Sequence, residues 1–195
     1  TYYKLKDYPA ALADFKKAVE LQPEYSANYL WRGSTYYQLK DYPAALTDFN
    51  KAIELQPEDG NNYYWRGRAY YELKDYPTAL DDFNKCIELE SENAYNFTWR
   101  GRVYLALKNP VNAQADFAQV ANFLGEEGRP AYYVAGGYAL PFQATEACSW
   151  LRQAFERDKD LVSEARTDSD FDPIRETEEF RKLMEEFGSN EKSAD

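Results

Sequence analysis

The 195 residues of this chain contain no histidine, and only two cysteines and one methionine supply sulfur. Without histidine the chain lacks the usual general base, the usual nitrogen ligand of zinc, and any Ser–His or Cys–His pair for nucleophilic catalysis. Its many carboxylates form no recognisable set with a metal site or a phosphate loop. We therefore predict a protein that is not an enzyme, with no catalytic residues, no metal site and no cofactor.

Positive charge is also scarce, since 23 lysines and arginines face 34 acidic residues, a net charge of −11. Nucleic acids and anionic membranes both attract a basic surface, so neither is an expected partner. No apolar run is long enough to span a membrane, which predicts no membrane insertion, and no signal peptide is visible. The compartment stays open, with the cytoplasm favoured.

The two cysteines, Cys86 and Cys148, suggest no redox chemistry. Cys86 falls at the repeat position that Ala18 and Ala52 occupy in earlier copies, which favours a small, buried packing residue. A disulfide between the two cysteines has no sequence pattern behind it.

What the chain does contain is a repeat of fixed length. A Trp-Arg-Gly triplet begins at Trp31, Trp65 and Trp99, at intervals of 34 residues (65 − 31 and 99 − 65). A constant period of this size indicates an array of helical hairpins, in which each unit buries its apolar face only against a neighbour.

The recurring residues resemble the tetratricopeptide repeat, whose pattern is an aromatic residue, Leu-Gly, Tyr, Ala-x3-Phe and Pro. The clearest copy supplies Tyr29, Gly33, Tyr36, Ala45, Phe49 and Pro57. The family's Leu before Gly is replaced by Arg32, Arg66 and Arg100. The resemblance, to a bacterial member of the family with a C-terminal capping segment, implies an all-α fold, a right-handed α-α superhelix of helical hairpins.

In this interpretation the repeat array spans residues 1–160, made of a partial repeat 1–25, full repeats 26–59, 60–93 and 94–127, and a divergent repeat 128–160. Residues 161–187 resemble the helical cap that closes many bacterial arrays, and 188–195 are predicted to be a disordered tail. Because the chain begins inside a repeat, we expect the natural protein to continue upstream with further repeats.

Each hairpin is predicted to hold a first helix and a second helix packed closely together. Gly33 lies within the first helix, where glycine costs about 1 kcal/mol relative to alanine. Its recurrence suggests a close approach, which we assign to Ala45 on the second helix. Arg32 is expected to pair with Asp48, and the same two contacts are expected in the next repeats.

The first helices carry the predicted ligand-binding groove. A helix turns by about 100° per residue, so Tyr29 and Trp31 lie on opposite faces. The resemblance implies that the tryptophan face lines a concave surface where peptides bind, and Trp, Tyr and Arg are enriched at binding hot spots. An equal alternative is that Trp31, Trp65 and Trp99 fill the core between neighbouring helices instead. The predicted groove residues are Trp31, Ser34, Tyr37, Tyr64, Trp65, Arg68, Tyr71, Tyr95, Trp99 and Arg102.

The expected function is a non-catalytic scaffold that binds a peptide or a segment of a partner protein. Arg68 and Arg102 favour an acidic or carboxylate-bearing partner. Some members of the family clamp the C-terminal carboxylate of a chaperone with Lys and Asn, and that partner is not expected here. The matching positions hold Leu30, Ser34, Trp65, Tyr95 and Trp99.

Two alternatives of other classes stay open. A saccharide is a candidate ligand for the row of tryptophans. The array is also a candidate for self-assembly, because the incomplete first repeat leaves an apolar face partly bare. That face, formed by Leu12, Phe15 and Val19, predicts a homo-oligomer through the N-terminal end.

Overall fold

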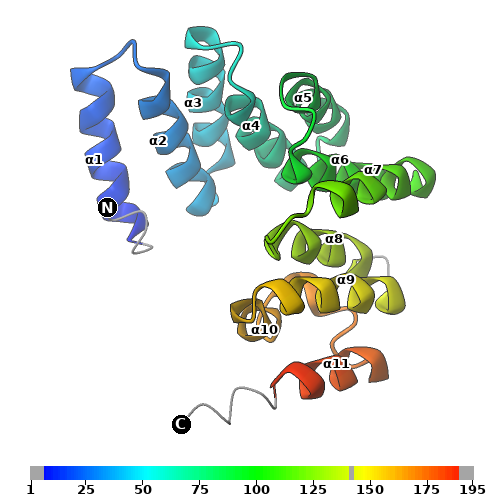
Figure 1. The fold of residues 1–195 in the computed structure, drawn as a ribbon. Helices are drawn as coiled ribbons and strands as arrows, with labels where there is room; N and C mark the ends of the chain where they lie inside the picture. The colour runs from blue at the N-terminus through cyan, green and yellow to red at the C-terminus, as the bar shows by residue number, and fades with distance from the viewer. Residues whose placement is uncertain (1–6, 141–142, 189–195) are drawn as a thin grey trace. The chain divides into compact units, whose positions relative to one another are not determined.

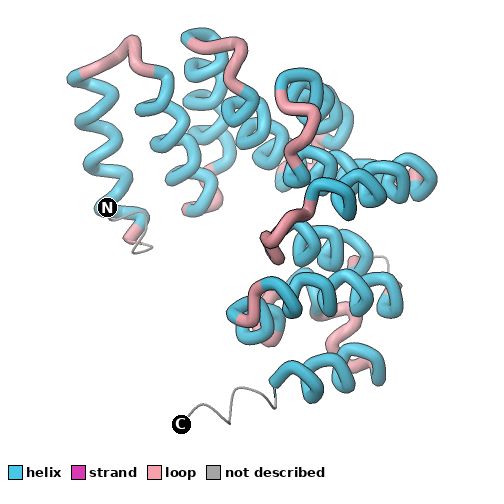
Figure 2. The backbone as a smooth tube through the Cα atoms, viewed as in Figure 1, coloured by secondary structure: helices cyan, strands magenta, loops and turns pink. Residues whose placement is uncertain are grey.

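A computed structural model of the chain describes residues 7–140 and 143–188, and every regular element within them is helical (Figures 1 and 2). None of these helices combines the length and the apolar character that crossing a bilayer requires. The elements are α1 (Tyr8–Leu21), α2 (Ser26–Gln38), α3 (Tyr42–Leu55), α4 (Gly60–Glu72), α5 (Tyr76–Leu89), α6 (Ala94–Ala106), α7 (Pro110–Phe123), α8 (Arg129–Ala139), α9 (Ala144–Arg157), α10 (Asp160–Ala165), the 3-10 helix η1 (Ser169–Phe171) and α11 (Glu178–Gly188).

The chain divides into two compact units, Thr1–Ser91 and Glu92–Asp195. In the first unit each helix packs on the next, and α2–α3 and α4–α5 form the two closest pairs. The core of this unit contains Tyr37, Ala45, Phe49 and Ala69, and Trp65 packs against it from one side. Helical hairpins stacked in sequence therefore build this unit, as the 34-residue period predicts.

The second unit contains two further hairpins, α6–α7 and α8–α9, and a closing segment. The first helix of the divergent repeat begins at Arg129, because Pro130 is accommodated in its first turn. The stretch 161–165, at the start of the predicted cap, belongs to the helix α10.

The closing segment covers the last two helices of the repeats. Helix α11 packs on α9, where the rings of Phe155 and Phe187 lie 5.4 Å apart. The ring of Phe171, in η1, lies 5.2 Å from that of Tyr132 on α8. Residues 161–187 thus bury the apolar faces that the final hairpin would otherwise expose. The predicted disordered tail falls almost wholly on residues 189–195, which lie outside the described residues.

The two helices of a hairpin meet where a phenylalanine ring lies on a glycine. A Cβ atom added to Gly33 would come within 2.6 Å of the ring of Phe49, and one added to Gly101 within 2.3 Å of the ring of Phe117. The nearest side chains to Gly33 are thus Phe49 and Asp48 rather than the expected Ala45. The recurring glycine makes room for an aromatic ring.

The turn between the helices of each hairpin contains a residue with a left-handed backbone. At the end of α2, the amide of Lys40 donates to the carbonyl of Tyr37, and the amide of Asp41 donates to that of Tyr36. This is the Schellman arrangement, whose left-handed position is usually glycine. Here lysine occupies it three times, with φ of 61° at Lys40, 63° at Lys74 and 58° at Lys108.

We expect Lys40→Gly to stabilise the protein. A non-glycine residue in this conformation costs on the order of 1–3 kcal/mol, whereas glycine loses roughly 0.5–1 kcal/mol more backbone entropy on folding. The free energy of unfolding, measured by urea denaturation, should rise by about 1 kcal/mol. Lys17→Gly, at an exposed position inside α1, is the matched control and should lower it by about 1 kcal/mol. Equal losses in both variants would contradict the argument.

Candidate protein-binding site

Two tryptophans of the first unit each pack on the helix before them. The ring of Trp31 on α2 stacks on Phe15 of α1 at 6.4 Å, and that of Trp65 on α4 stacks on Phe49 of α3 at 6.5 Å. Trp31 is nevertheless 46% exposed, and Trp65 is half-buried. These side chains therefore join neighbouring repeats and also present surface to solvent.

Arg68, one turn after Trp65 on α4, is surrounded by aromatic rings. Its guanidinium carbon lies 4.6 Å from the ring centre of Trp65, 4.9 Å from that of Tyr37 and 5.6 Å from that of Tyr64. Cation–π attraction of this kind strengthens when the cation is withdrawn from water, and Arg68 is half-buried. The Tyr37 hydroxyl accepts from Arg68 at 3.4 Å and donates to Glu72 at 3.3 Å. Burial raises the pKa of the Tyr37 phenol, so the hydroxyl remains protonated.

Arg102, in the second unit, holds the position of Arg68 one repeat later (102 − 68 = 34), and there the chain itself supplies a carboxylate. Its guanidinium donates to Oδ2 of Asp170 at 2.8 Å and to the carbonyl oxygen of Tyr133 at 3.0 Å, and it lies 4.9 Å from the Trp99 ring. A Cβ atom on Gly136 would come within 2.8 Å of that Oδ2. The absence of a side chain at Gly136 therefore lets the carboxylate reach the arginine.

The segment that supplies this carboxylate makes further contacts with α8. Asp168 accepts a hydrogen bond from the Tyr132 hydroxyl at 2.9 Å, and the ring of Phe171 packs on the same tyrosine. A short acidic stretch with one aromatic residue is thus held by an arginine and a tyrosine of the repeats. Asp170 lies outside the residues predicted for the site. The signal for it in the sequence is Gly136, which replaces arginine at the repeat position of Arg68 and Arg102.

The structure buries some of the predicted groove residues and leaves others accessible. Ser34, Tyr37, Trp99 and Arg102 are buried, so these four side chains do not form an accessible binding surface. The Ser34 hydroxyl donates to the carbonyl oxygen of Leu30 within its own helix. The accessible members are Trp31, Tyr64, Trp65, Arg68 and Tyr71 in the first unit and Tyr95 in the second.

The arginine that follows each tryptophan has a structural role. Nε and Nη2 of Arg32 donate to the two carboxylate oxygens of Asp48 at 2.8 and 2.6 Å, and this bidentate pair recurs at Arg66–Asp82 and Arg100–Asp116. The bond to Asp48 raises the pKa of the Arg32 guanidinium further. The expected pairing of these residues across each hairpin is therefore present, and their charges are not offered to a ligand.

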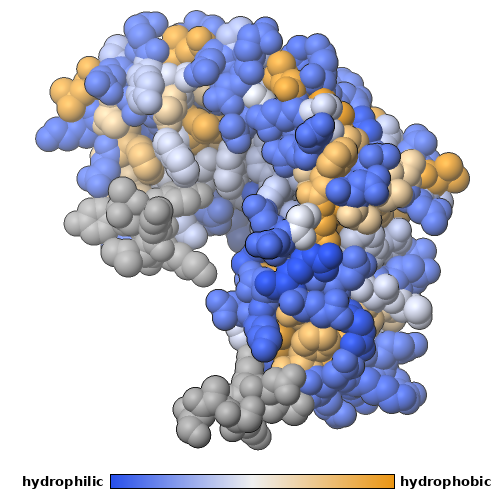
Figure 3. All heavy atoms as spheres, in the orientation of Figure 1, coloured by the Kyte–Doolittle hydropathy of each residue, from blue (hydrophilic) through white to orange (hydrophobic). Residues whose placement is uncertain are grey.

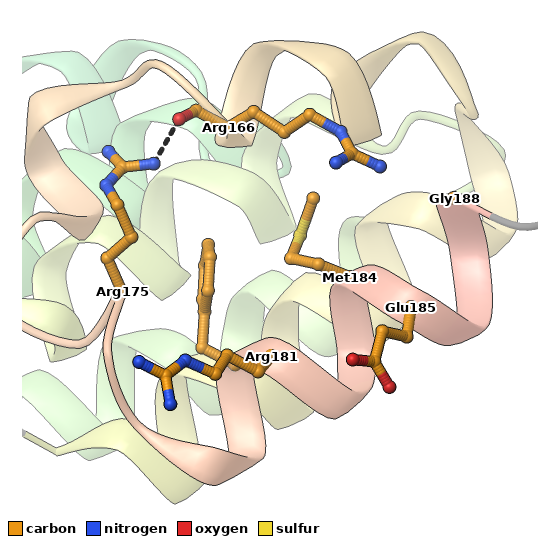
Figure 4. A pocket seen from close by; sticks show the side chains of 7 residues that line it. Arg166, Arg175, Arg181, Met184, Glu185 and Gly188 are labelled. Carbon is orange, nitrogen blue, oxygen red and sulfur yellow. Dashed lines mark hydrogen bonds between the residues drawn. The ribbon is translucent and has the colours of Figure 1, made fainter.

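A hollow of about 750 Å³ lies in the closing segment, outside the predicted site (Figure 4). Phe180 and Met184 form its apolar part, and Arg175 lies at its edge. Arg175 donates to the carbonyl oxygens of Ala165, Arg166 and Asp168, so it serves to hold the loop before α11. Among the described residues no group of histidine, cysteine and acidic side chains is arranged to hold a metal ion.

Two family models match the first part of the chain. One, described as a TPR repeat, matches residues 1–40 and 33–74, and one described as the tetratricopeptide repeat matches 62–93. The helices, paired in consecutive hairpins, have the arrangement of this family's solenoids. The chain is a tetratricopeptide-repeat protein. Proteins of this family are generally non-catalytic scaffolds for protein interactions, and the repeats support a scaffold role for this chain in that general sense.

Several solved structures resemble this tetratricopeptide-repeat protein. TTC0263, a thermophilic TPR protein of Thermus thermophilus, is 22% identical with a TM-score of 0.73, over 84% of this chain and 91% of that one. YrrB, a TPR protein with an unusual peptide-binding site, is 22% identical with a TM-score of 0.56, over 89% of this chain and 88% of that one. The first TPR of Spaghetti (RPAP3), bound to the HSP90 peptide SRMEEVD, is 27% identical with a TM-score of 0.54, over 55% of this chain and 85% of that one. No curated protein matches the chain in sequence.

We expect Asp170→Ala to destabilise the second unit, because it removes a carboxylate from the buried Arg102. Hydrogen bonds to charged groups contribute about 1.5–3 kcal/mol, and a loss of this size in the free energy of unfolding is expected. Asp172→Ala is the matched control, because Asp172 pairs with Arg175, three residues away, and is largely exposed. This substitution should lower the free energy of unfolding by less than about 1 kcal/mol. Denaturant titration of both variants checks the difference, and equal losses would contradict it.

Proposed function

We propose that this protein is a non-catalytic scaffold whose first unit binds an acidic segment of a partner protein, with Arg68 receiving one of its carboxylates. The observation that carries the proposal is the pair Arg102–Asp170. At the equivalent position one repeat later, an arginine beside a tryptophan already holds a carboxylate. The same repeat position in the first unit presents the same side chain in a similar aromatic setting.

The surroundings of Arg68 suit this role. Water is partly excluded there by the rings of Tyr37, Tyr64 and Trp65, and an ion pair is stronger where the effective dielectric constant is lower. Trp31 and Tyr71 add accessible aromatic surface in the same unit. Aromatic residues around a central arginine are the composition of binding hot spots.

The chain's own segment 168–172 suggests what the partner looks like. It reads Asp-Ser-Asp-Phe-Asp, so it offers several carboxylates and one aromatic ring within five residues. The HSP90 peptide bound by the first TPR of Spaghetti, SRMEEVD, is likewise rich in acidic residues. Since this chain has no Lys/Asn clamp at the expected positions, we assign recognition of the acidic segment to Arg68 and its aromatic neighbours. Within this proposal the repeats span residues 1–160, and 161–187 act as a cap.

A synthetic peptide with the sequence of residues 167–172 should bind the protein through Arg68. Arg68→Gln should weaken binding at least about tenfold, because one charge-assisted hydrogen bond is lost. Lys17→Gln removes an exposed positive charge from α1 of the same unit and should leave the affinity unchanged. Fluorescence anisotropy with the labelled peptide measures both, and binding should weaken as ionic strength rises.

The same assay tests the proposal against its alternatives. If the neutral peptide, with asparagine in place of each aspartate, binds equally well, carboxylate recognition at Arg68 is wrong. If a saccharide binds instead, and its binding depends on Trp31 and Trp65 but not on Arg68, the two tryptophans form a saccharide-binding site. Self-association through Leu12, Phe15 and Val19, each half-buried, also stays a prediction, which light scattering at several protein concentrations checks.

A further inference from the structure

In the hairpin α4–α5, an arginine side chain connects two neighbouring second helices. Arg66 of α4 donates to the carboxylate of Asp82 on α5 at 2.9 and 2.6 Å. It also donates to the side-chain oxygen of Asn50 on α3 at 2.8 Å. In the hairpin α6–α7 the equivalent guanidinium carbon, that of Arg100, lies 5.9 Å from the ring centre of Tyr104 on the same helix.

The hairpin α8–α9 has no arginine at this position. Val134 replaces the arginine, Trp150 replaces the aspartate, and Ala118 on α7 replaces the asparagine. Each of these residues lies two repeats, or 68 residues, after its counterpart in or beside α4–α5 (134 − 66, 150 − 82 and 118 − 50). The tyrosine is retained as Tyr138. The structure describes α8 and α9 in full, so the loss of the arginine is a property of this hairpin's own sequence.

A hollow of about 440 Å³ lies at this place, between α7, α8 and α9, and we call it the α7–α9 hollow. The ring of Phe117 at its base lies 5.1 Å from that of Tyr138 and 6.5 Å from that of Trp150. Phe117 is buried, whereas Tyr138 and Trp150 are half-buried and offer accessible ring surface. Gln114 and Glu146 contribute polar groups to the lining. The volume is within the range of about 300–1,000 Å³ that is typical of ligand pockets.

Glu146 is the carboxylate of the α7–α9 hollow. Its counterparts in the three earlier hairpins are Ala44, Thr78 and Asn112, so the acid is specific to α8–α9. Burial, and after it the charge of Glu146, raises the pKa of the Tyr138 phenol, which therefore remains protonated. Within the described part of the chain, no lysine or arginine forms an ion pair with Glu146.

We propose that the α7–α9 hollow is a second binding site, which receives an arginine side chain of a partner protein. The guanidinium lies on the rings of Tyr138 and Trp150 and donates to the carboxylate of Glu146. The face of an aromatic ring carries negative charge and attracts a cation, so the rings and the carboxylate act together. The hollow thus holds the partner's arginine where α4–α5 holds its own Arg66.

The lining favours arginine over lysine. A guanidinium is planar, stacks on aromatic rings and can meet a carboxylate with two N–H donors, whereas an ammonium group is compact and more strongly hydrated. The chain's own arginines show the preference, since the guanidinium carbon of Arg68 lies 4.6 Å from the ring centre of Trp65. The net charge of −11 also attracts a basic segment. This site lies in the second unit and prefers the charge opposite to that of the proposed ligand of Arg68, so the two sites are independent.

The probe that tests the proposal is the capped peptide acetyl-Gly-Arg-Gly-amide. Its matched control carries citrulline, which keeps the shape of arginine without the charge. NMR spectra of the ¹⁵N-labelled 195-residue chain follow the indole N–H signal of Trp150, which is assigned by its loss in Trp150→Phe. The arginine peptide should shift this signal saturably, and the citrulline peptide should bind at least about fivefold more weakly.

Glu146→Gln should weaken binding of the arginine peptide at least about fivefold, because the carboxylate that accepts from the guanidinium is lost. Glu156→Gln is the matched control, since Glu156 is an exposed acid of the same helix that does not line the hollow. It makes the same change in net charge and should leave the affinity unchanged. The pair of variants therefore separates local recognition from general attraction to an acidic chain.

Four results would overturn the inference. One is an equal affinity for the arginine and citrulline peptides, and another is equal weakening by Glu146→Gln and Glu156→Gln. The third is a lysine peptide that binds as tightly as the arginine peptide. The fourth is no saturable shift of the Trp150 signal at peptide concentrations up to about 10 mM. The peptide comparisons use the unaltered protein, so they stay valid even if a substitution in α9 alters folding.

Discussion

The close contact between the two helices of each hairpin is the constraint on which the rest of this structure depends. Glycine inside a helix costs about 1 kcal/mol, but burying a phenylalanine ring against it contributes roughly 2–3 kcal/mol. The neighbouring carboxylate of Asp48 is buried as well, which is tolerable only because Arg32 meets it with two hydrogen bonds. The contact recurs in the next two hairpins, at Gly67 with Phe83 and at Gly101 with Phe117, and it fixes which face of their helices is interior.

That constraint leaves the opposite face of a first helix free for other contacts. On α2 and α4, a tryptophan there packs on the phenylalanine of the preceding helix, and part of its ring stays at the surface. Whether such a residue is core or binding site is therefore decided repeat by repeat. Trp31 remains nearly half exposed, whereas Trp99 is buried beside Arg102 and Tyr133.

The use of positive charge follows the same logic. In a chain with a net charge of −11, most arginines are engaged within the fold, in the hairpin pairs or at the closing segment. On the face shown in Figure 3, apolar residues form small patches separated by hydrophilic ones. Recognition of a partner there therefore depends on a few well-placed groups rather than on a broad apolar surface. An arginine half-buried among aromatic rings is such a group, because its charge is screened less than that of an exposed lysine.

The sequence by itself determined the helical hairpins, their order and the pairing of Arg32 with Asp48. These follow from the 34-residue period and from local helix-start signals such as Asp41-Tyr42-Pro43, in which Asp41 caps α3 and Pro43 lies in its first turn. It did not determine that Phe49 rather than Ala45 meets Gly33, nor that Ser34 and Arg102 are buried. Tertiary structure decided these, since burial depends on which segment lies across a helix face. Arg102 meets Asp170 across 68 residues of chain, in a segment outside the repeat, and no periodic pattern predicts such a contact.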